Sequence, residues 1–555
     1  MRKSVAALSW TENPAIVSVV LSLVVLATRI PFATRFFFDW DSIQFALGLE
    51  RFDLAHHQPH PPGYILYMGA ARLFAFFTHD LNAGFVAVSI VASLGATLVV
   101  FALVQRLVRD RWSAALVACA FAFNPYVWFY GEVALNYIGD VFVSVAAAYL
   151  TLRILRERRP ALLLALTALL ALAGGFRQSS TLLFAPLWLL SLAALLRARK
   201  LNARILVTNV LLGLGLTALW LVPLVLLAGG IPAFRAALGT QAALSAGMTS
   251  VFFGAPWRIT AEKAALIGKM LVAVVHVGLF VPPVVLVVRR GATLFRAEDR
   301  ILAALAATWI LPSLFVYIFL HMGGSGYLMT VAPALILAFL LPAARLAERP
   351  EGRVLGRTII ALVILLEAAS FLFLNDPLFR RVPIMWEGTK SLERANHFVI
   401  TFSRATLVQN DLELEQMLDK IRMHAPESTV VVTEIGRRFR PPGTETWVDN
   451  TRIYFRHMGY YLPEYEVVEI VGDTGAYYKT RQHAPAEKVF GTDIPISADT
   501  EQLVVVTEYV DRDAQRESGM REELLLPSRK YLFWIDLQGK ESVRYAGYTF
   551  RKSSQ

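Results

Sequence analysis

Ionisable side chains gather in segments that join long apolar stretches, where short turns would be enough. The first such segment runs from Phe38 to Gly63 and carries Asp39, Asp41 and several histidines. A carboxylate there can take a proton from a hydroxyl or amide, and an imidazole can face an anion. Carboxylates and imidazoles at a membrane surface indicate chemistry on a substrate that arrives through the membrane, such as one attached to a lipid.

Asp41 has two interpretations from the local pattern. Asp41-Ser42 is a good N-cap for a helix over residues 43–52, so the carboxylate could serve only to cap that helix. A carboxylate that faces a dry groove could instead act as a general base. Asp39 is the alternative acid.

The histidines His56, His57 and His60 could suggest a metal site. The prolines among and after them make the segment extended, however, and further ligands at metal-binding spacing are missing. We expect no metal here. The residues His60–Tyr64 are predicted to form a rigid turn with His60 aimed at an anionic group, and His57 is a candidate contact for an acceptor or a sugar.

A second group lies between Tyr130 and Asp140. Helical spacing would place Glu132, Asn136 and Asp140 on one face, with Asp140 about two turns inside the membrane. Glu132 is a candidate for the catalytic site, and Asn136 and Asp140 are candidates for binding an acceptor or sugar. An internal hydrogen bond to another span is the alternative, because ionisable groups at such depth need a cavity or a partner.

Two further turns carry candidates for binding a phosphate. Arg177 lies where basic residues are otherwise scarce, and its fork of donors matches phosphate oxygens. His321 and Tyr327 flank a glycine-rich turn, in which glycine allows close backbone approach. A simple flexible turn is the alternative for this last segment.

The composition indicates the elements that must hold these residues. The 555 residues are 56% hydrophobic and 17% charged, with a mean hydropathy of +0.50. The chain is therefore predicted to be a polytopic α-helical membrane protein. About eleven apolar runs before residue 375 have the length needed to cross a bilayer.

Basic residues predict the orientation of the spans. Lys and Arg crowd five alternate loops, which the positive-inside rule assigns to the cytoplasm together with the N-terminus. This requires that Tyr64–Phe77 lies at the interface or re-enters without crossing. Residues up to 375 hold 30 basic and 16 acidic residues, and the rest hold 24 and 27. The basic balance thus reflects cytoplasmic loops and not a nucleic-acid surface.

The tail, residues 376–555, has a different pattern and is predicted to be a soluble extracytoplasmic α/β domain. A helix is expected at Glu413–Met423, and strands at 429–433, 466–471 and 503–507. The clusters at 437–442 and 460–463 could bind carbohydrate or protein, although surface or packing roles are more common. Cys119 is the only cysteine, so disulfides and Cys-based zinc sites are excluded, and no cofactor is expected.

Several of these motifs together resemble those of the polytopic GT-C glycosyltransferases, in particular the protein O-mannosyltransferase-like branch. The resemblance covers roughly residues 15–375. It rests on Asp41-Ser42-x-x-Phe45, His60-Pro61-Pro62-Gly63-Tyr64, Gly131-Glu132-Val133-x-Leu135-Asn136 and the later His321…Gly326-Tyr327…Pro333.

The resemblance implies inverting transfer of a sugar from a polyprenyl-phosphate donor at the outer membrane face. Asp41 occupies the family's acidic position and would be the base. Arg177, with His60 or His321, would stabilise the departing phosphate, and Glu132 would hold the acceptor or sugar hydroxyls. Gln44 stands where relatives often carry a second acid, which argues against a mechanism or metal site that needs a carboxylate pair there.

The implied partners are the lipid-linked donor, a glycan, lipid or protein acceptor, and membrane lipids. The expected location is a bacterial inner (plasma) membrane. The alternatives are a transporter or flippase of a lipid-linked or polar substrate, which should show repeated halves that this sequence lacks, and a non-catalytic membrane protein.

Overall fold

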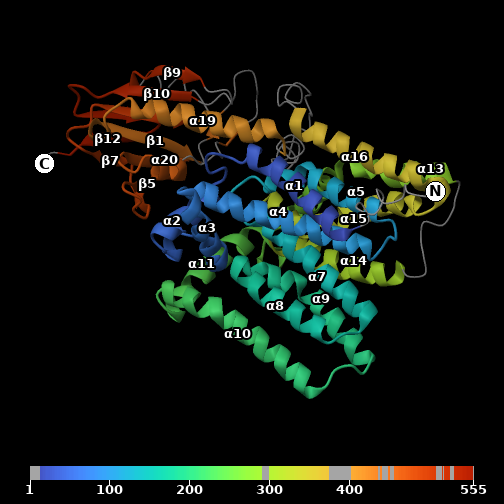
Figure 1. Cartoon of the computed structure of the whole chain (residues 1–555). Helices are drawn as coiled ribbons and strands as arrows, with labels where there is room; N and C mark the ends of the chain where they lie inside the picture. Colours follow the sequence, from blue (N-terminus) through green and yellow to red (C-terminus); the bar gives the residue numbers. More distant parts are fainter. Residues whose placement is uncertain are drawn as a thin grey trace. The chain divides into compact units, whose positions relative to one another are not determined.

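A computed structural model describes residues 13–289, 299–373, 402–435, 438–439, 448–449, 455–507, 516, 518–525 and 531–553. The chain forms two compact units (Figure 1). One comprises Met1–Thr34 and Pro61–Leu407, and the other comprises Arg35–His60 and Val408–Gln555. The second unit therefore contains most of the first polar segment.

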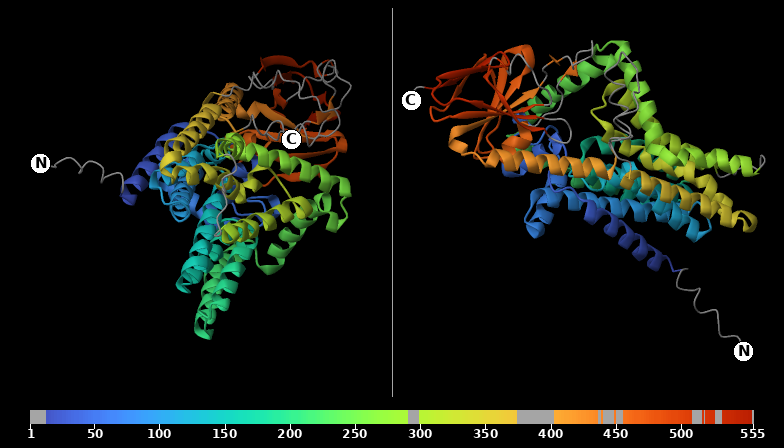
Figure 2. Two further views of the ribbon diagram at one scale, coloured as in Figure 1. Left: turned by 90° about the vertical axis from the view of Figure 1, so that its right-hand side faces the viewer. Right: turned by 90° about the horizontal axis from the view of Figure 1, so that it is seen from above.

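The first unit consists of long helices that run roughly alongside one another (Figures 1 and 2). Within its described residues the α-helices are α1 Pro14–Arg29, α3 Ile65–Thr78, α4 Leu81–Gln105, α5 Arg111–Phe123, α6 Pro125–Tyr130, α7 Tyr137–Glu157, α8 Ala161–Phe176, α9 Gln178–Arg197, α10 Ala203–Leu227, α11 Ile231–Thr249, α12 Trp257–Val275, α13 Val281–Arg289, α14 Asp299–Phe315, α15 Ala332–Ala347 and α16 Arg353–Phe373.

Among the described residues, eight helical segments are long and apolar enough to cross a membrane. They are Pro14–Phe32, Leu81–Gln105, Tyr137–Glu157, Gln178–Arg197, Ala203–Leu227, Trp257–Val288, Asp299–Leu320 and Pro350–Phe373. Four shorter apolar helices accompany them, α3, α5, α8 and α15. The chain is therefore an integral membrane protein, as predicted, whereas the number of eleven spans stays a prediction.

Side-chain caps start some of the helices, and apolar residues make up most of their length. Asp80 caps α4 by accepting the Ala83 N–H, and Asn202 caps α10 by accepting the Ile205 N–H. Only 11% of the apolar window of α10 is buried in the protein. A helix that is apolar on its exposed sides is suited to contact lipid.

The second unit is built on a seven-stranded sheet with the order β6-β5-β4-β1-β8-β10-β9. The central strands β4, β1 and β8 are parallel, and β5 and β10 run antiparallel to their inner neighbours. These strands are β1 Thr429–Ile435, β4 Glu466–Val471, β5 Ala476–Thr480, β6 Glu487–Phe490, β8 Gln502–Thr507, β9 Arg521–Leu525 and β10 Tyr531–Asp536.

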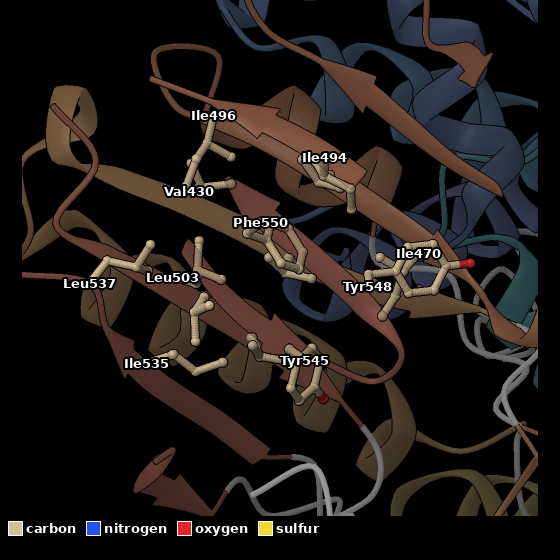
Figure 3. Close-up of a cluster of buried hydrophobic side chains, with 14 of the residues drawn as sticks. Val430, Ile470, Ile494, Ile496, Leu503, Ile535, Leu537, Tyr545, Tyr548 and Phe550 are labelled. Carbon is tan, nitrogen blue, oxygen red and sulfur yellow. The ribbon is translucent and has the colours of Figure 1, made fainter. Parts of the chain in front are cut away.

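Both faces of this sheet are covered. A smaller sheet of β7 Asp493–Ile496, β11 Ser542–Tyr545 and β12 Tyr548–Lys552 covers one face, where Val430, Leu503 and Phe550 meet in a buried cluster (Figure 3). The helices α19 Arg404–Arg422 and α20 Phe455–Tyr461 pack on the other face. A pair β2 Arg438–Phe439 and β3 Val448–Asp449 lies outside both sheets. The predicted α/β tail is confirmed.

The predicted elements of the tail match the structure closely. The expected helix is the C-terminal part of α19, and the three expected strands are β1, β4 and β8. The predicted boundary at residue 375 lies outside the described residues, as does most of the cluster at 437–442. The tyrosines of the second cluster belong to α20 and pack against Phe36 and Phe37.

Candidate functional site

The acidic segment of the second unit forms the helix α2, Trp40–Glu50. Asp39 is the N-cap of this helix, because its extended backbone lets its side chain accept the Asp41 N–H at 2.9 Å. The expectation that Asp41-Ser42 caps a helix over 43–52 is therefore wrong. The helix starts earlier, and Asp41 lies in its first turn.

The side chain of Asp41 lies beside His60. The distance from Asp41 Oδ1 to His60 Nδ1 is 3.7 Å, and the two side chains are 34% and 15% exposed. Burial and the neighbouring Asp41 carboxylate raise the pKa of Asp39 to about 6. Burial, with nearby Arg456, lowers the pKa of His57. The segment thus presents one capping acid and one acid paired with an imidazole.

Close packing fixes the return of the chain toward α2. A Cβ on Gly48 would lie 2.6 Å from Pro59, so this position of the helix requires glycine. The ring of Phe45 lies 5.2 Å from the His60 ring. These contacts explain how a proline-rich stretch holds His60 near the start of the helix.

In the helical unit, Arg177 occupies an extended break between α8 and α9. Its guanidinium pairs with Asp140 at 2.6 Å, and the Ser180 hydroxyl donates to the same carboxylate. Arg177 and Asp140 are only 6% and 3% exposed. The guanidinium also lies 4.8 Å from the ring of Tyr137 and 4.4 Å from the ring of Tyr327. Arg177 is therefore a buried, charge-paired cation held between aromatic faces.

His321 and Tyr327 belong to the same neighbourhood as Arg177. Their rings lie 5.7 Å apart. The predicted close approach of the glycine turn is present at Gly326, where a Cβ would lie 2.2 Å from the ring of Tyr137. Arg177, His321 and Tyr327 are thus brought together, as the phosphate-binding hypothesis requires.

Sequence reasoning missed a further cation here, Lys263 of α12. It is 9% exposed, and its ammonium donates to the Thr249 carbonyl at 2.6 Å. The Thr249 hydroxyl lies 3.4 Å from His321 Nδ1, so one residue links Lys263 to His321. The signal that could have identified Lys263 is a charged residue at the edge of an apolar span, where ionisable groups often have a function.

The segment that carries Glu132 differs from its prediction. Residues 131–136 are not helical, and α7 begins at Tyr137, so the expected single helical face of Glu132, Asn136 and Asp140 is wrong. Asp140 lies in the first turn of α7, and its predicted depth in the membrane stays a prediction. The Ser89 hydroxyl donates to the Val133 carbonyl at 2.8 Å, which satisfies a backbone group that the break leaves outside a helix.

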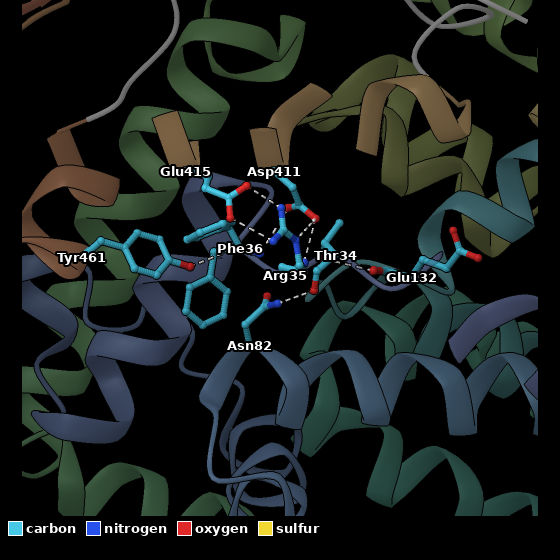
Figure 4. Close-up of polar contacts among 9 residues, drawn as sticks. Thr34, Arg35, Phe36, Asn82, Glu132, Asp411, Glu415 and Tyr461 are labelled. Carbon is cyan, nitrogen blue, oxygen red and sulfur yellow. Dashed lines mark hydrogen bonds and ion pairs between the residues drawn. The ribbon is translucent and has the colours of Figure 1, made fainter. Parts of the chain in front are cut away.

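Glu132 itself is fully buried. It accepts the Trp128 indole N–H at 2.5 Å, and its carbonyl accepts the Thr34 N–H at 3.1 Å (Figure 4). Asn82 donates to the Thr34 carbonyl at 2.6 Å. These contacts give Glu132 a position in a packed polar cluster, and its catalytic role stays a prediction.

Within the described part of the chain, no group of three or more His, Cys, Asp or Glu side chains is placed to hold a metal ion.

Another buried acid that the sequence did not single out is Glu367 of α16, which is 2% exposed and has Asn124 Nδ2 at 3.5 Å.

Neither a family model nor a curated protein matches the chain. Among solved structures, it is similar to ArnT from Cupriavidus metallidurans bound to undecaprenyl phosphate, with 15% sequence identity and a TM-score of 0.48 over 95% of this chain and 98% of that one. It is also similar to the apo state of ArnT from the same organism, with 14% identity and a TM-score of 0.46 over 96% and 98%.

Proposed function

We propose that this chain is a membrane glycosyltransferase of the GT-C type. It transfers a sugar from a polyprenyl-phosphate-linked donor to a glycan, lipid or protein acceptor. The transfer takes place at the outer face of the inner (plasma) membrane, with inversion at the anomeric carbon. The sequence motifs support the family, and the surroundings of Asp41 and Arg177 support the roles of these residues.

Inverting transfer is a single displacement. The bond from the anomeric carbon to the phosphate oxygen breaks, and its electron pair leaves with polyprenyl phosphate. The acceptor oxygen or nitrogen forms the new bond and loses its proton to a base. The reaction therefore needs one positioned carboxylate and cationic groups for the departing phosphate.

The observation that carries the proposal is the difference between the two neighbouring acids. Asp39 caps α2, whereas Asp41 lies in the first turn and faces His60 at 3.7 Å. The Asp41 side chain does not cap the helix, because Asp39 does. Asp41 can therefore gain or lose a proton without disrupting the first turn of α2. Asp41 is therefore the better base, and Asp39 is the alternative.

The cationic groups suit a phosphate bound among aromatic side chains. Arg177 is buried beside Tyr327, and Lys263 is linked to His321 through Thr249. Such groups would stabilise charge that grows on the leaving phosphate, because donors in a dry site need no reorganisation. His60, which lies 3.7 Å from Asp41, stays a candidate for facing an anionic group. Asn136, Asp140 and His57 remain candidates for binding acceptor or sugar.

The test uses purified full-length protein in detergent, without any sealed compartment. A panel of radiolabelled undecaprenyl-phosphate sugars is incubated with extracted cell-envelope material as acceptor source, and covalent products are separated and assigned an anomeric configuration. Inverted product that depends on Asp41 supports the proposal. Movement of the lipid-linked sugar only across sealed vesicles, with no covalent product, would identify a transporter or flippase.

A further inference from the structure

Side chains of α19 hold the start of the segment 35–60. The Asp411 carboxylate accepts the Arg35 N–H at 2.8 Å and the Phe36 N–H at 3.2 Å. Glu415, one turn later, accepts two hydrogen bonds from the Arg35 guanidinium at 3.0 and 2.8 Å (Figure 4). Two backbone donors outside any helix or strand are thus satisfied by one buried carboxylate.

Side chains of α20 hold the next residue, Phe37. Its N–H donates to the Tyr461 hydroxyl at 2.8 Å, and His457 Nε2 lies 3.1 Å from its carbonyl. The Phe37 ring is 1% exposed and packs edge-to-face on Tyr460 at 5.3 Å. Both backbone groups of a residue only two positions before Asp39 are therefore fixed by α20.

A second set of contacts holds the other side of α2. His483 pairs with Glu50 at the end of this helix, and this hydrogen bond raises the pKa of His483. Arg456 donates to the His56 carbonyl at 3.1 Å, and its guanidinium lies 5.3 Å from the Trp40 ring. The acidic helix is thus anchored on both sides by residues more than 370 positions away in the sequence.

We propose that the C-terminal domain is a positioning element for the transfer reaction. Asp411, His457 and Tyr461, here called the loop clamp, fix the backbone that leads into Asp39 and Asp41. This inference rests on the proposed function, in which Asp41 is the base. The loop clamp acts through Asp41 and contacts no reacting atom, and its purpose is to keep the carboxylate in a productive geometry.

Activity measurements compare Asp411→Ala with Asp419→Ala, an exposed aspartate on the same helix. Displacement of a catalytic group by about 1 Å can cost about 10²-fold. We expect Asp411→Ala to lower kcat by about 10²-fold with little change in KM for the lipid-linked donor, and Asp419→Ala to change neither. Asp411→Asn keeps one acceptor oxygen and should recover part of the loss. Tyr461→Phe keeps the ring and removes the hydroxyl, so it should fold and still lower kcat.

Amide hydrogen exchange gives a readout that needs no activity. Peptides that cover residues 33–44 should exchange faster in Asp411→Ala and Tyr461→Phe than in wild type or Asp419→Ala. Unchanged exchange, or faster exchange with unchanged kcat, overturns the positioning role. If the wild type transfers no sugar, the proposed function fails, while the exchange rates still decide whether the loop clamp holds this segment.

Discussion

Asp39 and Asp41 are two residues apart, but their surroundings give them different tasks. Asp39 holds the start of α2, and Asp41 faces His60. Asp41→Asn should therefore abolish transfer while expression and thermal stability stay nearly unchanged. The loss of a general base typically costs about 10²–10⁴-fold. Initial rates with radiolabelled donor check this, and activity above about a tenth of wild type would rule out Asp41 as the base.

Asp39→Asn is the matched control for the assignment of the base. Asparagine caps a helix nearly as well as aspartate, so the fold should survive. If Asp41 is the base, this variant keeps most of its activity. Loss of transfer in Asp39→Asn, with transfer retained in Asp41→Asn, would move the role to Asp39.

The raised pKa of Asp39 predicts a dependence of stability on pH. Its pKa rises from 3.8 to about 6 on folding. The folded protein therefore binds this proton more tightly than the unfolded chain, and stability is lost as the pH rises across that window. As the pH rises from about 4 to 7, the melting temperature of the wild type should fall relative to that of Asp39→Asn. Parallel melting curves across this window would show that the cap titrates normally.

Arg177 forms a buried ion pair with Asp140. The variant Arg177→Ala would therefore combine a loss of stability with any loss of phosphate binding. Removal of one member of a buried ion pair costs about 3–5 kcal/mol, because the other charge stays buried. The double variant Arg177→Ala/Asp140→Asn removes both charges. We expect it to lose less stability than Arg177→Ala alone, because no unpaired charge stays buried, while KM for the lipid-linked donor rises about 10–100-fold.

The controls for Arg177 are Asp140→Asn and Arg177→Lys. Lysine keeps the charge but loses the fork of donors, so it should recover only part of donor use. Steady-state kinetics with each substrate varied in turn separates the two effects. Equal losses for donor and acceptor in Arg177→Lys, which keeps Asp140, would indicate a general defect in folding and not a phosphate contact.

At the scale of elements, the sequence predicts helices and strands well where their pattern is local. Long apolar runs became helices, and β-branched runs became β1, β4 and β8. The errors lie at helix starts. Two acids near the start of α2 could each have been the cap, and only the extended backbone of Asp39 decides between them. The break at 131–136 was missed because Ser89, more than 40 residues earlier, supplies its hydrogen bond.

That break gives a prediction for the fold. Ser89→Ala removes the partner of a buried carbonyl, which should cost about 1–3 kcal/mol. Ser93, one turn later in α4, is equally buried, and its hydroxyl has no hydrogen-bond partner among the described residues. Ser93→Ala should therefore be neutral or slightly stabilising. Thermal melting in detergent compares them, and equal melting temperatures would show that Ser89 does not support the break.

At the scale of the molecule, residues that could do chemistry can be predicted from the sequence. The residues that they contact in the fold are harder to predict. Arg177, His321 and Tyr327 were predicted from residue type and position, and the structure brings them together. The assignment of residues 35–60 to the C-terminal unit was not predicted. Contacts such as Asp411 with Arg35 join positions 376 residues apart, and no local periodicity reports them.

This assignment sharpens the test of topology. Because residues 35–60 and 408–555 form one compact unit, we expect both on the same side of the membrane, and the positive-inside rule predicts that this is the outer side. Single cysteines replace exposed residues in a Cys119→Ser background: Arg51→Cys in the first segment, Ser497→Cys in the C-terminal domain and Lys200→Cys in a predicted cytoplasmic loop. A membrane-impermeant thiol reagent should label the first two in intact cells and the third only after lysis. Labelling of Arg51→Cys and Ser497→Cys from opposite sides would contradict the compact unit, and labelling of both only after lysis would invert the predicted orientation.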